Sequence, residues 1–162
     1  MKMYVLKQEQ LLPLPIDEAW RFFVHPANLP LITPPDLGFR ITGDLPEKMH
    51  AGMIVTYTVT PFLRMPVQWV TEITHMCEPR FFVDEQRFGP YRMWHHQHIF
   101  TETPDGTRMT DLVHYVLPFG PLGRLVAPFV SRRVRDIFSF RREALGRALG
   151  FSIGPGTRLH KF

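Results

Sequence analysis

The stretch that decides the fold runs from Phe82 to Phe100 and reads FVDEQRFGPYRMWHHQHIF. Its second half has the composition of a β-strand, in which successive side chains point to opposite faces. One face of that strand carries two aromatic and two imidazole side chains, namely Trp94, His96, His98 and Phe100. Packing alone rarely places histidine on such a face, because a buried polar group costs free energy unless it is hydrogen-bonded. The pattern predicts a cavity with polar groups in its wall.

The strand that follows is expected to add to the same wall. Asp105 and Gly106 form a hairpin signal, because both residues tolerate the positive φ angles of a type I′ turn. A two-residue loop at these positions fixes the register of the two strands. In that register His96 lies opposite Tyr115, His98 opposite Val113 and Phe100 opposite Asp111.

Further candidates for this polar group come from the two neighbouring strands. The predicted register brings Asp111 and Tyr115 to the face of the two histidines. On the preceding strand Asp84 and Gln86 are candidates, although the Gly89-Pro90 turn leaves the register of that strand open by one residue. The predicted ligand-binding residues are therefore Asp84, Gln86, Trp94, His96, His98, Phe100, Asp111 and Tyr115.

The rest of the chain predicts an α+β domain with a seven-stranded, curved antiparallel sheet around a long C-terminal helix. Apolar residues at helical spacing indicate that helix from about Pro121 to Leu149, and two short helical segments, Ile16 to Val24 and Asn28 to Pro35, follow the first strand. A helix lying across a concave sheet leaves a space of the kind that binds ligands. The predicted strands are Tyr4–Leu12, Phe39–Thr42, Met53–Thr60, Val67–Met76, Arg80–Phe88, Arg92–Thr103 and Arg108–Leu117.

Length and composition favour one domain. With 162 residues, of which 44% are hydrophobic, the chain can bury a sizeable core but not two separate ones. We expect the domain to cover residues 1–150. Residues 151–162, which contain Gly154-Pro155-Gly156, are expected to form a flexible tail.

The positive net charge does not identify a nucleic-acid partner. The formal charge is +4, and seven arginines fall between Arg124 and Arg147, within the predicted C-terminal helix. The apolar residues of this helix form one stripe and most arginines lie off it, which predicts a packed helix with a solvated basic face. No nucleic-acid-binding motif is present. Contact of the basic face with an acidic membrane remains an alternative, and the sequence identifies no protein partner.

The sequence predicts a cytoplasmic protein. Cys77 is the only cysteine, so no internal disulfide can form, and Met1 opens directly into a strand-like run without an apolar signal segment. We also expect no bound cofactor, because Gly120-Pro121-Leu122-Gly123 is too short to cradle a phosphate and lacks a following Lys-Ser/Thr.

The chain resembles the START-like superfamily, also called SRPBCC. The resemblance rests on LPIDEAWRFF from Leu14 to Phe23, on the segment from Phe82 to Phe100, and on Asp111 and Tyr115. It covers about residues 3 to 150 and is similar to a bacterial subgroup described as ligand-binding or polyketide-cyclase-like. The resemblance implies a helix-grip fold and a small, mostly apolar ligand held between the sheet and the last helix.

The polar group is open to several interpretations. It can be a structural hydrogen-bond network, or it can select one carbonyl or hydroxyl of an apolar ligand. It can also be catalytic, as in a cyclase or dehydratase, with His96, His98 and Asp111 as the candidate acid and base residues. Two histidines two residues apart on a strand could share a metal with a carboxylate, but without further ligand motifs we expect no metal.

Overall fold

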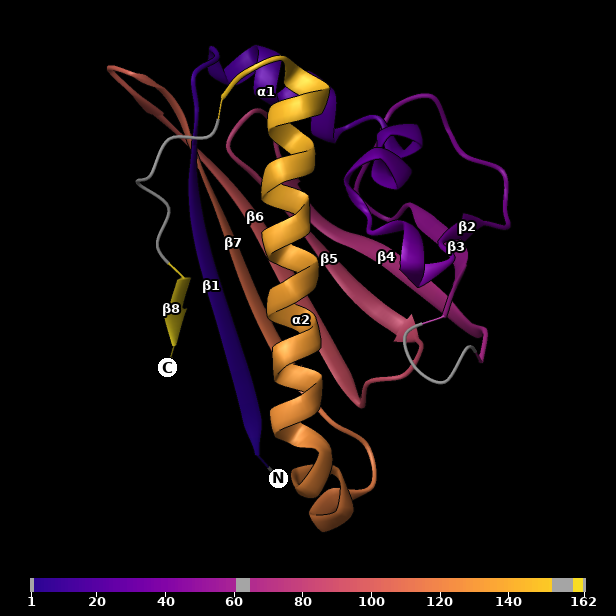
Figure 1. Ribbon diagram of the computed structural model, residues 1–162. Helices are drawn as coiled ribbons and strands as arrows, with labels where there is room; N and C mark the ends of the chain where they lie inside the picture. Colours follow the sequence, from indigo (N-terminus) through magenta and orange to yellow (C-terminus); the bar gives the residue numbers. More distant parts are fainter. Residues whose placement is uncertain (1, 61–64, 153–158, 162) are drawn as a thin grey trace.

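The computed structural model describes residues 2–60, 65–152 and 159–161 (Figure 1). All strands join one antiparallel sheet in the order β2-β3-β4-β5-β6-β7-β1-β8. The strands are β1 (Met3–Leu12), β2 (Arg40–Ile41), β3 (Ile54–Val59), β4 (Val67–Cys77), β5 (Phe81–Phe88), β6 (Met93–Thr103), β7 (Gly106–Val116) and β8 (Leu159–Lys161). The helices are α1 (Ile16–Phe23), the 3₁₀ helices η1 (Pro26–Ile32) and η2 (Pro35–Leu37), and α2 (Gly120–Leu149).

The predicted fold class is confirmed. The seven predicted strands correspond to β1 through β7, short helices follow β1, and the predicted C-terminal helix is α2. The structure adds β8, which pairs with β1 at Leu6 to Gln8 and lies within the segment expected to be a tail. Residues 153–158 and 162 of that segment lie outside the described residues.

The predicted register of β6 and β7 is wrong by two residues. Thr103 pairs with Gly106, so the loop consists of Pro104 and Asp105, and Gly106 already belongs to β7. Gly106 has a φ of 126°, and a Cβ there would lie 2.3 Å from the carbonyl oxygen of Leu12, so this position needs glycine for reasons of both backbone and space. The observed pairs are Trp94 with Tyr115, His96 with Val113, His98 with Asp111 and Phe100 with Met109.

A shift of two residues leaves every side chain on its predicted face, because the side-chain period of a strand is two. His96, His98, Phe100, Asp111, Val113 and Tyr115 are all buried, as one shared inner face requires. The sequence therefore predicted correctly which side chains face the interior, although it predicted the wrong partners across the two strands.

Helix α2 lies across one face of the sheet, with α1 at one end (Figure 1). Two buried glutamines of β1 fasten it there: Gln8 Nε2 donates to the carbonyl oxygen of Phe138 over 3.2 Å, and Gln10 Nε2 donates to that of Arg142 over 3.3 Å. These bonds fix where the helix sits along the sheet.

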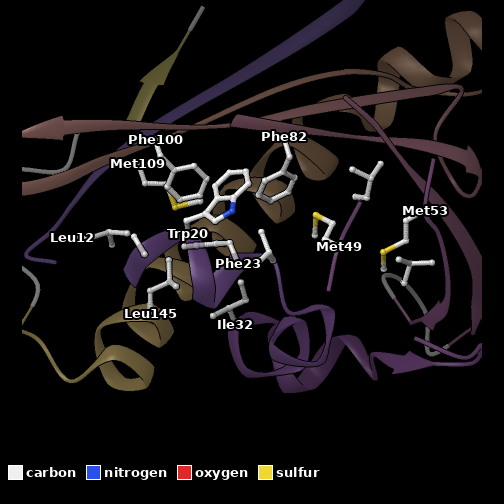
Figure 2. Close-up of a cluster of buried hydrophobic side chains, with 14 of the residues drawn as sticks. Leu12, Trp20, Phe23, Ile32, Met49, Met53, Phe82, Phe100, Met109 and Leu145 are labelled. Atoms are coloured by element: carbon white, nitrogen blue, oxygen red, sulfur yellow. The ribbon is translucent and has the colours of Figure 1, made fainter. Parts of the chain in front are cut away.

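Two apolar clusters fill opposite ends of the space between sheet and helices. In the first, Trp20 of α1 packs edge-on against Phe82 and Phe100, as Figure 2 shows. In the second, Val113 and Tyr115 pack against residues of α2, and Trp94 contacts them. On β6, Phe100 thus belongs to the first cluster and Trp94 to the second. His96 and His98 lie between them on the same face.

Candidate functional site

Two histidines and two aspartates from three neighbouring strands form a closed ring of short contacts. His96 Nε2 lies 2.9 Å from Asp111 Oδ1, and His98 Nε2 lies 2.8 Å from Asp84 Oδ2. His96 Nδ1 lies 3.3 Å from Asp84 Oδ2, and His98 Nδ1 lies 3.1 Å from Asp111 Oδ1. The last contact is at ion-pair distance but lacks hydrogen-bond geometry. We call these four residues the His-Asp cluster.

The strand order explains why the cluster forms. Asp84 on β5 pairs directly with His96 on β6, and His98 on β6 pairs directly with Asp111 on β7. Side chains of directly paired residues lie side by side on one face of a sheet. The cluster therefore needs all three strands in this register.

Apolar groups enclose the cluster. His96 and His98 are 3% and 5% exposed, and Asp111 is 4% exposed. The ring of Phe82 stacks on that of His98 with centroids 4.1 Å apart, and Phe138 of α2 packs edge-on against His96. In such surroundings the interactions between charges are stronger than in water.

Mutual attraction keeps the cluster charged. Burial raises the pKa of the Asp84 and Asp111 carboxyl groups, but the charges and hydrogen bonds of His96 and His98 outweigh it and hold both pKa values well below the ordinary range. Burial likewise lowers the pKa of His96, and the two carboxylates outweigh it, so that this pKa is raised. The charged forms of Asp84, Asp111 and His96 are therefore favoured within the cluster.

A cavity of about 190 Å³ lies between the sheet, α2 and the α1–η1 segment. This volume is below the roughly 300 to 1,000 Å³ of common ligand pockets, so it suits a small ligand. Its wall is mostly apolar and aromatic. The lining residues include Phe22, Phe23, Leu29, Tyr57, Trp69, Tyr91, Trp94, Ile137 and Phe138.

Four of the eight predicted ligand-binding residues line this cavity: Asp84, Trp94, His96 and His98. The other four take different positions. Phe100 belongs to the core under α1, and Asp111 holds the two imidazoles from the side opposite Asp84. The hydroxyl of Tyr115 lies 2.8 Å from Ser131 Oγ, and Gln86 bonds both backbone groups of Tyr91.

Sequence reasoning missed the contribution of α2 to the cavity. Arg133, Ile137 and Arg141 recur at intervals of four residues and line the cavity together with Val134 and Phe138. The expectation that the arginines form a solvated face holds only in part for Arg133 and Arg141, which are half-buried and line the cavity. The spacing of four places them on the stripe of Ile137, which is the signal that could have identified them.

The sheet also supplies polar residues that the sequence did not single out. Trp69 on β4 has a buried indole Nε1 with no hydrogen-bond partner among the described residues. Its ring stacks on Tyr57, whose hydroxyl lies 3.0 Å from Thr71 Oγ1. Burial raises the pKa of Tyr57, so this phenol stays protonated and can act as a hydrogen-bond donor.

Asp84, His96 and His98 place one ligand atom each within 4.8 Å of one another, which is close enough to share a metal ion. In this structure the same side chains pair with one another. His96 Nε2 is hydrogen-bonded to Asp111, and His98 Nε2 is hydrogen-bonded to Asp84.

The sequence matches no protein-family model and no curated protein sequence. Solved structures do match. Ms6760 from Mycobacterium smegmatis is 20% identical, covers 91% of this chain and 91% of its own, and has a TM-score of 0.66. TTHA0849 from Thermus thermophilus is 16% identical over 89% and 98% of the two chains, with a TM-score of 0.64. Ara h 8.0201 is 13% identical over 90% and 99%, with a TM-score of 0.61.

At sequence identities of 13–20%, these similarities are evidence for a shared fold only. The shared features are the curved antiparallel sheet, the short helices after the first strand and the long C-terminal helix across the sheet. The chain therefore has a helix-grip fold of the Bet v 1-like kind.

Proposed function

We propose that this protein binds a small, mostly apolar molecule in the cavity between the sheet and α2, as a member of the START-like group that its sequence resembles, and that it does so in the cytoplasm. The observation that carries the proposal is the cavity itself, which is walled by aromatic side chains and has a few polar groups at defined places. Such a lining provides contact area for an apolar body and directional bonds for one or two polar atoms.

The His-Asp cluster serves this binding as one polar wall of the cavity. Asp84 is its most accessible member, with 17% of its side chain exposed, and its carboxylate can accept a hydrogen bond from a hydroxyl or amide of the ligand. The cluster supports acid-base catalysis less well. Both Nε2 atoms are hydrogen-bonded to carboxylates, His96 Nδ1 lies 3.3 Å from Asp84 Oδ2, and His98 Nδ1 is buried beside Asp111, an arrangement that favours internal pairing over proton transfer with a substrate.

The binding proposal can be tested with a neutral aromatic probe, 2-naphthamide. Isothermal titration calorimetry should detect binding to the wild-type protein. Ile137→Trp fills the cavity from α2 and should weaken binding by about 10-fold or more, since overpacking costs about 1–3 kcal/mol. Leu125→Trp, on an exposed part of the same helix, is the matched control and should bind as the wild type does. Equal binding by both variants would place the probe elsewhere and contradict the proposal.

A second candidate function, docking on an acidic membrane, is favoured by one observation. Apolar side chains at the start of α2 are strongly exposed, and Phe119 and Leu125 are 80% and 78% exposed. Leu122, Val126 and Phe129 extend this apolar patch, and the exposed Arg124 and Arg132 lie beside it in the helix. Exposed apolar residues flanked by arginines suit an anionic lipid surface. In the ranges that the structure describes, no helix has the length and apolar character needed to cross a bilayer.

Vesicle co-sedimentation tests this second candidate. Vesicles of phosphatidylcholine mixed with phosphatidylserine should bind the protein more strongly than vesicles of phosphatidylcholine alone, and added salt should weaken the binding. The double variant Leu125→Ser, Phe129→Ser should lose it. Phe88→Ser removes an equally exposed aromatic residue from the end of β5 and is the control. Equal binding to the two kinds of vesicle would rule this candidate out. Undiminished binding by the double variant would also rule it out.

A further inference from the structure

Arg141 is a half-buried charged group, and two of its three guanidinium nitrogens have no hydrogen-bond partner in the described part of the chain. It lines the cavity from α2, and its Nε and Nη1 atoms are buried without a hydrogen-bond partner among residues 2–60, 65–152 and 159–161. No carboxylate in those ranges forms an ion pair with it. Burying two donor nitrogens of a cation is costly, because they give up hydration without a replacement.

The position of the guanidinium group is fixed by an aromatic neighbour. Arg141 Cζ lies 5.1 Å from the centroid of the Phe138 ring, within the range of a cation–π contact. Phe138 in turn packs edge-on against His96. The cation is thus held one ring away from the His-Asp cluster and is separate from it.

The other arginine that lines the cavity, Arg133, has a carboxylate partner. Arg133 lines the same cavity eight residues earlier on the same helix, and its Nη2 lies 2.7 Å from Asp36 Oδ2. Asp84 also lines the cavity but forms no ion pair with Arg141, and its Oδ2 contacts His96 and His98 instead. The cavity therefore contains one compensated arginine and one uncompensated arginine.

We infer that the ligand carries an anionic group, of which a carboxylate is the simplest kind, and that Arg141 binds it. This inference rests on the proposed ligand-binding function. A guanidinium group presents planar donors that match a carboxylate, and such charge-assisted bonds are the stronger hydrogen bonds of proteins. The buried Nε1 of Trp69, on the wall opposite α2, offers a neutral donor for a second polar atom of the same ligand.

The inference specifies an amphipathic acid. Its apolar body would lie along Trp69, Tyr91 and Trp94, and its anionic end would meet Arg141. Entry of a carboxylate would give the Arg141 guanidinium group a partner of opposite charge, as Asp36 already does for Arg133. A neutral ligand of the same shape would leave the cation unpaired and should bind more weakly.

A matched pair of probes tests the inference. The anion 2-naphthoate and the neutral 2-naphthamide have nearly the same shape, and calorimetry gives the ratio of their affinities. The wild-type protein should prefer the anion by about 10- to 100-fold, as expected for a hydrogen bond to a charged group. Arg141→Met should abolish the preference, because the affinity for 2-naphthoate should fall about 10- to 100-fold more than the affinity for 2-naphthamide. Arg133→Met, the control, should keep the preference.

The outcomes separate the two proposals. Failure of both probes to bind the folded wild-type protein would overturn the ligand-binding function and this inference with it. Binding of both probes with equal affinity would overturn the inference alone. If Arg141→Met does not fold, the ratio of the 2-naphthoate and 2-naphthamide affinities of the wild-type protein still tests the inference. Arg141→Lys then keeps the charge but loses the planar donor arrangement, and it should show a reduced preference.

Discussion

Two charged groups at the cavity, the buried His-Asp cluster and the half-buried Arg141, differ in whether a side chain of opposite charge contacts them. In the His-Asp cluster every imidazole nitrogen has a carboxylate oxygen within 3.3 Å. Arg141, about one aromatic ring away, has no such partner among the described residues. A group that is satisfied from within contributes to the native structure, whereas a buried group left unsatisfied is a cost that a ligand can remove. We therefore expect the His-Asp cluster to stabilise the structure of the site and Arg141 to contribute to ligand binding.

Breaking the cluster should have the largest effect on stability. Asp111→Ala removes the carboxylate that His96 and His98 share on the side away from the cavity. Removing one partner of a buried ion pair costs about 3–5 kcal/mol, because the remaining charge is left without compensation. Urea unfolding followed by circular dichroism should show a loss of this size.

The matched control for this change is an exposed ion pair. Asp36→Ala removes the partner of Arg133, whose contact with Asp36 is near the surface. Exposed pairs contribute about 0–1 kcal/mol, so the loss should be much smaller. Equal losses for Asp111→Ala and Asp36→Ala would mean that the cluster is not a special source of stability.

The cluster was largely predictable from the sequence because it depends on strand periodicity. Alternation alone put His96, His98 and Asp111 on one inner face, and an error of two residues in the register did not change that face. What periodicity could not provide was the direct pairing of Asp84 with His96, since the bend at Gly89-Pro90 left the register of β5 undetermined. Gln86 shows the same limit, because its bonds to Tyr91 became evident only in the folded turn.

Arg141 was not predicted because its role depends on tertiary packing. In the sequence it is one of seven arginines in a helix, and an arginine most often extends to solvent. Only the docking of α2, which Gln8 and Gln10 fix from β1, turns the side of the helix that carries Arg141 toward the cavity. Helical periodicity identifies the stripe, but it cannot say how wide the buried part of that stripe is.

The pH dependence of stability should reveal the charges of the cluster. The pKa of His96 is raised in the folded state by Asp84 and Asp111, so its contribution is complete below about pH 6.5 and is lost as the pH rises through the folded value. The pKa values of both carboxyl groups are lowered, so their contributions are complete above about pH 3.8 and are lost toward lower pH. Stability should therefore be highest between these limits, with each group changing it by at most about 1.4 kcal/mol per pH unit on its own side.

Urea midpoints measured from pH 3 to pH 9 test this profile, and the variants distinguish its sources. His96→Gln should remove most of the decline on the alkaline side. His114→Gln is the control, because His114 lies on the opposite face of the sheet and its pKa is lowered by partial burial and by His95. It should leave the alkaline decline in place. A wild-type protein whose stability did not change between pH 6 and pH 9 would show that His96 is not held protonated by its neighbours.

Removal of the uncompensated cation should have the smallest effect and the opposite sign. Arg141→Met keeps an unbranched side chain against Phe138 but takes away a half-buried charge that has no carboxylate partner in the described parts of the chain. Without ligand, the variant should be as stable as the wild type or more stable by about 0.5–2 kcal/mol, the gain expected where a residue is kept for function at the expense of stability. The same urea titration measures it. A loss of several kcal/mol, comparable to that of Asp111→Ala, would mean that Arg141 is bound within the native structure and that the contrast between the two groups does not exist.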